Sequence, residues 1–256
     1  MLLSRVLAGL GACAAIFGAI AGRAGAAETP LFVGSEPIPA DAVVLFDGKD
    51  LSQWTYVDGS PANWKVQDGW AEARGGNIRS KQEFGDHQLH VEFWLPVMNG
   101  AQGQGRANSG VYLQGSYEIQ VLDSYGLKPG PGDCGAIYGV GPAMVNACRP
   151  AGTWQSFDIF FRAPKFNADG SKAADARVTI LQNGVLIHEH AAIPGPTAAG
   201  IERDITKPGP VMLQDHGNPV RFRNIWVRPL GAQKIERARV ARRTLSGEER
   251  SQRKVA

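Results

Sequence analysis

Two-residue turn signals recur along this chain, and several lie beside short runs of alternating apolar and polar residues. Asp68-Gly69 follows the run Trp64–Val66, and Asn183-Gly184 separates Val178–Ile180 from Val185–Ile187. Such dipeptides close tight hairpins because both turn positions need a positive φ. With 32 glycines, 16 prolines and no repeat of fixed period in 256 residues, the sequence predicts a single all-β domain rather than a solenoid or propeller.

The segment Asn108–Tyr125, NSGVYLQGSYEIQVLDSY, shows the clearest alternation. If it forms a pair of strands, one face carries apolar residues that belong in a core. The other face then presents Glu118 and Gln120, with Asn108 beside them. The apolar residues of the pair are Val111, Leu113, Ile119 and Val121.

Leu89–Leu95 alternates in the same way, which predicts one buried face and a second face that bears His90, Glu92 and Trp94. The expected architecture is a jelly-roll β-sandwich of two antiparallel sheets, one of them concave. The long segments 98–107 and 126–151 are expected to form loops at the rims of a cleft.

The N-terminus has the anatomy of an export signal over residues 1–26: Arg5, an apolar run, and the small-residue site Ala24-Gly25-Ala26. A membrane anchor is disfavoured because the run is short, broken by glycines and closed by Arg23. Lipid attachment at Cys13 is a minor alternative. The mature protein is therefore expected in the periplasm or outside the cell, with no transmembrane span after signal removal.

Composition divides the mature chain into a Pro-rich lead (27–42), a domain (43–231) and a tail (232–256) that is short and helical or disordered. The tail holds eight basic and three acidic side chains, whereas the rest of the mature chain is mildly acidic. A basic appendage on an acidic domain argues against nucleic acid as the main ligand. The sequence gives no indication of the oligomeric state.

Two cysteines, Cys134 and Cys148, remain after signal removal, and they flank a Gly- and Pro-rich stretch. In an exported protein, two cysteines most simply form one disulfide. Closing a loop of this size stabilises a fold by roughly 3 kcal/mol in the chain-entropy model. A thiolate metal site is less favoured, because the close Cys or His pairs of zinc motifs are missing.

Two polar clusters are candidates for chemistry. Glu118 and Gln120 share a strand face and Asp123 follows them, while Gln214 and His216 share a face at a second strand end. A carboxylate and an imidazole in one cleft are suited to binding one divalent metal ion or to acid/base catalysis. Taken singly, such a glutamate is more often a solvated or ion-paired surface residue and such a histidine is more often structural, so the hypothesis depends on their convergence. Serine-hydrolase, zinc-protease and phosphate-loop motifs are all missing, and no nucleotide or organic cofactor is indicated.

Seven blocks in order make the chain resemble the 3-keto-disaccharide hydrolase family, over about Val43 to Leu230. The blocks are LFDGKDLSQW (45–54), WKVQDG (64–69), FGDHQLHVEFWLP (84–96), NSGVYLQG (108–115), YEIQVLDSYG (117–126), AIYG (136–139) and LQDHGNPVRFRNIWV (213–227). That resemblance implies a concanavalin-like jelly roll with a concave ligand-binding face. It also implies cleavage of 3-keto-glycosides by C2 proton abstraction, elimination of the C1 substituent and hydration.

In that setting His216 is the candidate base or metal ligand, and Glu118 is the candidate metal ligand or alternative base. Candidate contacts to substrate or metal are Gln120 and Asp123, and candidate contacts to the sugar are Asn108, Arg79, Tyr138 and Gln214. The expected partner is a carbohydrate substrate. The alternative function is a non-catalytic glycan-binding module of the cell envelope, because a fold does not fix a function.

Overall fold

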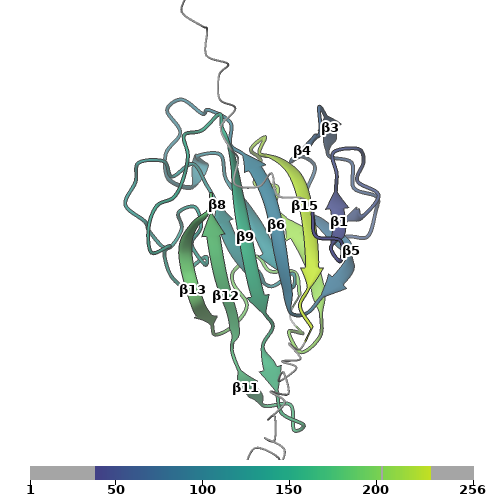
Figure 1. Ribbon diagram of the computed structural model, residues 1–256. Coiled ribbons are helices and arrows are strands. Elements are labelled where there is room, and N and C mark those ends of the chain that lie inside the picture. The colour runs from purple at the N-terminus through teal and green to yellow at the C-terminus, as the bar shows by residue number, and fades with distance from the viewer. Residues whose placement is uncertain (1–37, 203, 232–256) are drawn as a thin grey trace, which may run out of the picture. The chain divides into compact units, whose positions relative to one another are not determined.

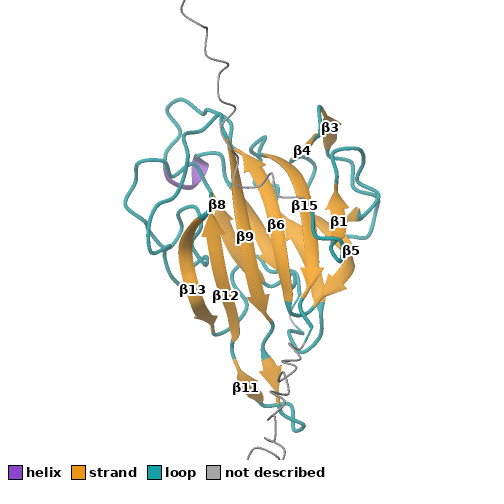
Figure 2. Cartoon of the chain, viewed as in Figure 1, coloured by secondary structure: helices purple, strands orange, loops and turns teal. Residues whose placement is uncertain are grey.

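The computed structural model describes residues 38–202 and 204–231, which form two antiparallel β-sheets packed face to face (Figure 1). Figure 2 shows that the remainder is almost entirely loop, with one short 3₁₀ turn, η1 (Gly103–Gly105). The predicted jelly-roll β-sandwich of the concanavalin type is therefore confirmed. Among the described residues, no helix has the length and apolar character needed to cross a membrane. The predicted signal (1–26), most of the lead and the tail lie outside the described residues.

The larger sheet has eight strands in the order β13-β12-β9-β6-β15-β4-β3, with β1 also paired to β15. Its strands are β1 (Val43–Phe46), β3 (Lys65–Gln67), β4 (Trp70–Glu72), β6 (His87–Trp94), β9 (Trp154–Arg162), β12 (Ala176–Gln182), β13 (Val185–Ile193) and β15 (Arg221–Pro229). A separate two-stranded sheet is formed by β10 (Lys165–Phe166) and β11 (Lys172–Ala174).

The smaller sheet has five strands in the order β2-β5-β14-β7-β8. They are β2 (Trp54–Tyr56), β5 (Ile78–Phe84), β14 (Gly209–Leu213), β7 (Ser109–Leu113) and β8 (Tyr117–Val121). The last two form the predicted strand pair, in a register that places Tyr112 opposite Glu118 and Gly110 opposite Gln120.

The core lies between the sheets and is built from the inward positions of both. Val111, Leu113, Ile119 and Val121 are fully buried there, as the alternation predicted. The Tyr117 ring of the smaller sheet packs 5.5 Å from a phenylalanine ring of β9, which joins the two layers directly. Burying the apolar face of this hairpin leaves its polar face directed away from the core.

The two hairpin signals have the geometry expected for their sequences. Asp68 and Gly69 have φ of 48° and 80°, and Asn183 and Gly184 have φ of 53° and 81°. They connect β3 to β4 and β12 to β13 respectively. Each turn leaves two residues between paired strands, which fixes the register and hence the face on which every side chain of the hairpin lies.

The second face of Leu89–Leu95 is covered rather than open to solvent. His90 and Glu92 are only 2% and 7% exposed, because Asp158 of β9 and Arg223 of β15 close over them. The Trp226 ring adds apolar cover, since it stacks on His90 with 5.3 Å between the ring centroids. Period-two alternation identifies the two faces of a strand but does not show what covers the polar one.

Candidate active site

A small pocket of about 160 Å³ lies on the outer face of the five-stranded sheet. Sites that bury a drug-sized ligand occupy about 300–1,000 Å³, so this one suits a small group such as a single sugar ring. It brings together six of the eight residues singled out from the sequence. The lining residues are Gln104, Asn108, Glu118, Gln120, Tyr138, Ala198, Ala199, Gln214 and His216.

The strand register explains why these residues meet. Asn108 immediately precedes β7, Glu118 and Gln120 lie on the neighbouring β8, and Gln214 immediately follows β14 on the other side of β7. The Gln214 backbone nitrogen donates to the Gly110 carbonyl at 3.0 Å, which holds the end of β14 against β7. Three adjacent strands therefore fix the floor of the pocket.

Glu118 is the buried acid of this floor, with 3% of its surface exposed. Burial raises its pKa to about 7, and a hydrogen bond from the Tyr112 hydroxyl opposes that rise. A carboxyl in this state is shared between its acid and its ionised form near neutral pH, which suits a group that takes and returns a proton.

Gly110 provides the space that the Glu118 carboxyl occupies. A Cβ atom at position 110 would lie 2.5 Å from Glu118 Oε1, well inside contact distance, and 3.0 Å from the Tyr112 ring. Since Gly110 pairs with Gln120 in the hairpin, the missing side chain leaves a recess in the sheet face beside its polar residues.

Tyr112 is held by Gln214, whose Nε2 donates to the Tyr112 hydroxyl oxygen at 3.1 Å. The hydroxyl proton is then free to point at Glu118, consistent with the raised pKa of Tyr112, which follows from burial and from the neighbouring Glu118 charge. Gln214 Oε1 is buried and has no hydrogen-bond partner in the described structure. It is a spare acceptor at the edge of the pocket.

The Gln120 carboxamide connects Glu118 to two further amides. In one orientation its nitrogen donates to the side-chain oxygens of Gln104 (3.0 Å) and Asn108 (3.1 Å), which leaves its oxygen against Glu118. In the reversed orientation the nitrogen donates to Glu118 Oε1 at 2.9 Å. The reversed orientation gives the Glu118 carboxylate a donor, so Gln120 is assigned as a hydrogen-bond donor to Glu118.

Two loops close over this floor, and one of them is the predicted rim loop 126–151. The Tyr138 backbone nitrogen donates to the Glu118 carbonyl at 3.1 Å, which seats the 126–151 loop along β8. From the other side, Thr197 Oγ1 accepts a hydrogen bond from the Glu118 backbone nitrogen at 2.9 Å. Ala199 follows with a φ of 57°, a left-handed conformation that turns the chain over the pocket.

His216 lines the pocket from the segment after β14, and its side chain is exposed. It therefore differs from Glu118 in environment: one titratable group is solvated at the mouth, and the other is buried in the floor. The sequence hypothesis that a carboxylate and an imidazole face one cleft agrees with this placement.

Two predicted contacts do not line the pocket. Arg79 lies on the same sheet face but two strands away, opposite Met212, and its guanidinium is 3.6 Å from the Glu202 carboxylate. Asp123 lies beyond the end of β8, where its backbone nitrogen donates to the Arg106 carbonyl at 3.1 Å. Proximity in sequence placed Asp123 near Gln120, but the strand ends before it reaches the pocket.

Cys134 and Cys148 carry free thiols in this structure, which does not show the predicted disulfide. Their sulfurs are nevertheless neighbours, because Gln182 Nε2 lies 3.5 Å from one and 3.3 Å from the other. Burial raises the pKa of the Cys134 thiol, and the hydrogen bond between the two thiols lowers that of Cys148. The pairing therefore stays a prediction.

Residues 41–228 match the model of the 3-keto-alpha-glucoside-1,2-lyase-like domain. The chain belongs to this family. Its seven sequence blocks fall within the matched range, and the residues that line the pocket do as well. The family resemblance seen in the sequence is confirmed.

Solved structures agree with this family membership. One provisionally assigned glycosyl hydrolase from Parabacteroides distasonis is 43% identical, with a TM-score of 0.69, over 75% of this chain and 84% of that one. A second from the same organism is 26% identical, with a TM-score of 0.51, over 74% of this chain and 99% of the other. No curated protein matches the chain.

Sequence reasoning missed several residues that shape the family pocket. Tyr112 and Gly110 share the polar face of the hairpin with Glu118, and the period-two alternation of the sequence predicts that placement. The alternation does not predict that the Tyr112 hydroxyl donates to Glu118 or that Gly110 leaves room for its carboxyl. Gln104 contributes an amide from a rim loop, and Ala198 and Ala199 contribute little but backbone. No residue-type signal distinguishes those two alanines.

Proposed function

We propose that this protein cleaves glycosides whose sugar carries a ketone at C3, releasing the substituent at C1. Family membership supports the substrate class, and the observation that carries the proposal is the buried Glu118 with a pKa of about 7 in a small polar pocket. A C3 ketone acidifies the C2 proton, so the first step needs a base that is partly ionised near neutral pH.

In the proposed reaction, the Glu118 carboxylate takes the C2 proton and the electron pair moves into the C3 carbonyl as an enolate. Return of that pair forms the C1–C2 double bond and expels the oxygen at C1, which leaves with a proton. Water then adds across the double bond, with hydroxyl at C1 and hydrogen at C2, and gives the free 3-keto-sugar. The net change is hydrolysis of the C1–O bond.

The remaining pocket residues have roles suited to their chemistry. His216, exposed at the mouth, is proposed to protonate the departing C1 oxygen, because its ring can carry a proton to the pocket. The Asn108 and Gln120 amides are proposed to donate to the enolate oxygen, and Gln214 Oε1 to accept from a sugar hydroxyl. Tyr138 is proposed as a ring contact at the rim.

An alternative to these base and acid roles is one divalent ion held by Glu118 and His216. The donor set fits only in part: the described residues hold no group of three or more histidine, cysteine or acidic side chains, so the other ligands would be amide oxygens or water. When bound, such an ion would polarise the C3 carbonyl oxygen. Loss of turnover in EDTA, restored by added Mn²⁺ or Ca²⁺, would support the ion; unchanged turnover would remove it.

The decisive experiment is incubation of the purified protein with p-nitrophenyl 3-keto-glucoside, beside the same glucoside with an unoxidised C3. We expect nitrophenol release from the keto compound alone, because only it has an acidic C2 proton. Release from both at equal rates would point to an ordinary glycosidase. If neither is cleaved in the presence of metal and the keto compound still binds, the protein is a glycan-binding module.

Export and the disulfide are proposed together, since an oxidising compartment favours the bond. N-terminal sequencing of the protein from cells should begin at about residue 27, and thiol titration of that material should find neither Cys134 nor Cys148 reactive. Two titratable thiols in an exported, denatured sample would refute the disulfide without affecting the export proposal.

A further inference from the structure

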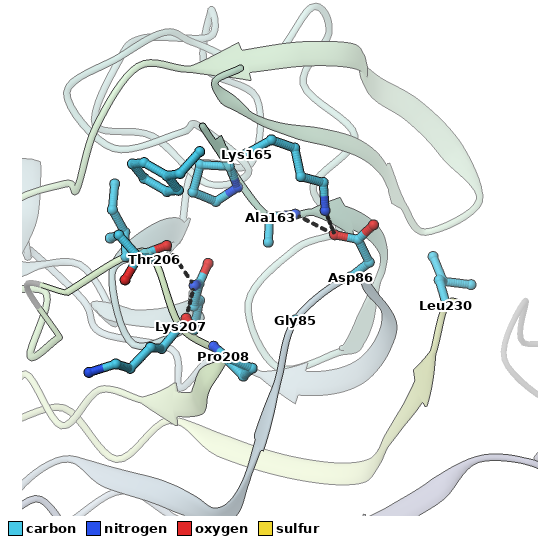
Figure 3. Close-up of a pocket in the computed structure, with 12 residues that line it drawn as sticks. Gly85, Asp86, Ala163, Lys165, Thr206, Lys207, Pro208 and Leu230 are labelled. Atoms are coloured by element: carbon cyan, nitrogen blue, oxygen red, sulfur yellow. Dashed lines mark hydrogen bonds and ion pairs between the residues drawn. The ribbon is translucent and has the colours of Figure 1, made fainter. Parts of the chain in front are cut away.

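A second and larger depression, of about 510 Å³, lies away from the candidate active site and shares none of its lining residues (Figure 3). It forms where segments from both sheets end. Asp86 comes from the β5–β6 turn, Lys165 from β10, Thr206 and Lys207 from the loop before β14, and Leu230 from the end of β15. None of its lining residues is an acid with a pKa near neutral. We therefore place the proposed cleavage in the candidate active site, although that pocket is smaller.

Its walls combine apolar and polar surface. Phe166, Pro164 and Pro208 provide a ring and two aliphatic surfaces, and Figure 3 shows Asp86 and Lys165 on one side of the opening and Thr206 on another. A carboxylate and an ammonium side by side present an acceptor and a donor to adjacent groups of one ligand. A pyranose ring has the matching pattern, with an apolar C–H face and hydroxyls around its edge.

The polar groups are held in place before any ligand arrives. The Asp86 carboxylate accepts from the Ala163 backbone nitrogen at 2.9 Å, from Lys165 Nζ at 3.0 Å and from Arg162 at 3.3 Å. Burial alone would raise the pKa of Asp86, but these hydrogen bonds outweigh it and lower the pKa. Because a carboxylate has about four acceptor positions, one remains for a ligand hydroxyl.

The opposite wall is fixed by Gln114, which is 2% exposed and adopts a φ of 52° in the β7–β8 turn. Its Nε2 donates to the Ile205 carbonyl at 3.2 Å and to the Lys207 carbonyl, which holds the Thr206 segment. Gln114 Oε1 is buried and has no partner in the described structure. This wall is therefore held in place by Gln114 and by the Thr206 hydroxyl, which donates to Asp204.

The charged pairs at this depression favour a neutral ligand over an anion. Lys165 shares the Asp86 carboxylate with Arg162, and Lys207 pairs with Asp204, whose Oδ2 lies 2.8 Å from Nζ. An anion would have to compete with these carboxylates for each lysine, whereas a neutral hydroxylated ring uses the pairs as they stand. We propose that this depression is a second, non-catalytic binding site for a neutral pyranose ring, independent of the reaction proposed above.

The test is titration of the full-length, isotope-labelled protein with maltose and cellobiose, followed by backbone amide shifts in NMR spectra. Binding should shift the amides of Ala163, Thr206 and Leu230 saturably, at millimolar concentrations that are usual for small neutral sugars. The Glu118→Gln variant should give the same shifts. Absence of shifts at these amides up to tens of millimolar, or a stronger response to glucuronate than to maltose, would overturn the proposal.

Two variants test whether the sugar binds in this depression. Phe166→Ala removes the ring and should weaken binding about tenfold, as expected for an aromatic contact. Asp47→Asn is the matched control, because Asp47 also pairs with a lysine, Lys49, beside a different depression. Its affinity should equal that of the wild type. Equal affinity in Phe166→Ala, with a wild-type thermal midpoint, would show that the sugar binds elsewhere.

Discussion

Each outer sheet face of this protein carries a buried glutamate at the middle of a strand, and the two are in opposite electrostatic states. Glu92 of β6 is 7% exposed and Glu118 of β8 is 3% exposed. The pKa of Glu92 is lowered to about 2, whereas that of Glu118 is raised to about 7. Burial acts in the same direction on both, so the difference comes from their neighbours.

Glu92 is surrounded by donors. Arg223 Nε lies 2.7 Å from Oε2, Asn224 Nδ2 lies 2.8 Å from Oε1, and His90 Nε2 lies 3.7 Å from Oε1. Glu118 has only neutral neighbours, the Tyr112 hydroxyl and the Gln120 amide. A buried carboxyl paired with cations is a structural element, and one left with neutral donors becomes a titratable group near neutral pH.

The variant with the largest expected effect on this contrast is Glu118→Gln, which removes the proposed base but keeps the shape of its side chain. Cleavage of the 3-keto-glucoside should fall by about 10² or more, while the free energy of unfolding at pH 7 stays the same or rises, because no buried acid needs a proton or a charge. Steady-state kinetics and urea unfolding measure both. Glu83→Gln, on an exposed position of β5, is the control and should behave as wild type. Near-native turnover in Glu118→Gln would remove Glu118 from the reaction.

The second test measures how the stability that His90 contributes beside Glu92 changes with pH. Burial lowers the pKa of His90, but hydrogen bonds to Asp158 and Glu92 outweigh it and raise the pKa to about 9, above the unfolded value of 6.5. The stabilisation is therefore complete below pH 6.5 and is lost as pH rises through 9, by an amount on the order of 3 kcal/mol.

Urea unfolding between pH 6 and 10 measures how steeply the free energy of unfolding changes with pH. It should be followed in Glu118→Gln, because Glu118 has its own window: its raised pKa makes stability fall as pH rises from 4.5 to about 7. His90→Gln in that background should flatten the slope between pH 6.5 and 9. A profile that is already flat there would mean that His90 is not held as a cation.

The third test is Glu92→Gln, the matched partner of the first. Losing the charge leaves Arg223 and His90 less well compensated, and breaking a buried pair costs about 3–5 kcal/mol. Arg223 is about one-third exposed (33%), so we expect about 2 kcal/mol in the free energy of unfolding. Turnover, measured where the variant is folded, should stay within about twofold. A strong loss of turnover with unchanged stability would reverse the roles of the two glutamates.

The fourth test narrows the recess in which Glu118 lies. Gly110→Ala would place a methyl 2.5 Å from Oε1 and force the carboxyl to move, so turnover should drop about tenfold. Gly195→Ala is the control, since a Cβ atom there meets nothing within 4 Å. If both variants keep wild-type turnover, the position of the carboxyl is less restricted than the structure indicates.

The sequence was sufficient for the fold and for much of the site because both follow from local rules. Turn dipeptides and period two predicted the hairpin of β7 and β8, and hence that Glu118 and Gln120 share a face. The two glutamates could not be told apart in this way, since HVEFW and YEIQV have the same pattern. Their difference depends on Arg223 and Asn224, which reach Glu92 from a strand more than 130 positions away.

The errors have the same origin. Arg79 and Asp123 were assigned by residue type and by proximity in the chain, while the structure gives one an ion pair with Glu202 and places the other beyond a strand end. Tyr112 was on the correct face, but its hydrogen bond to Glu118 depends on the antiparallel register and on the space at Gly110. Tertiary pairing, rather than residue type, decides these contacts.

The smallest expected effect isolates that one hydrogen bond. The Tyr112 hydroxyl lowers the pKa of Glu118 against the effect of burial, so Tyr112→Phe should raise that pKa further. Because the base acts when ionised, the acid limb of the kcat/KM profile should move to higher pH, with the plateau above it largely kept. Tyr117→Phe is the control: its buried hydroxyl faces the core and has no hydrogen-bond partner in the described structure, so the limb should not move. An equal shift in both variants, or a lowered plateau with no shift in Tyr112→Phe, would show that Tyr112 acts through packing rather than through the proton affinity of Glu118.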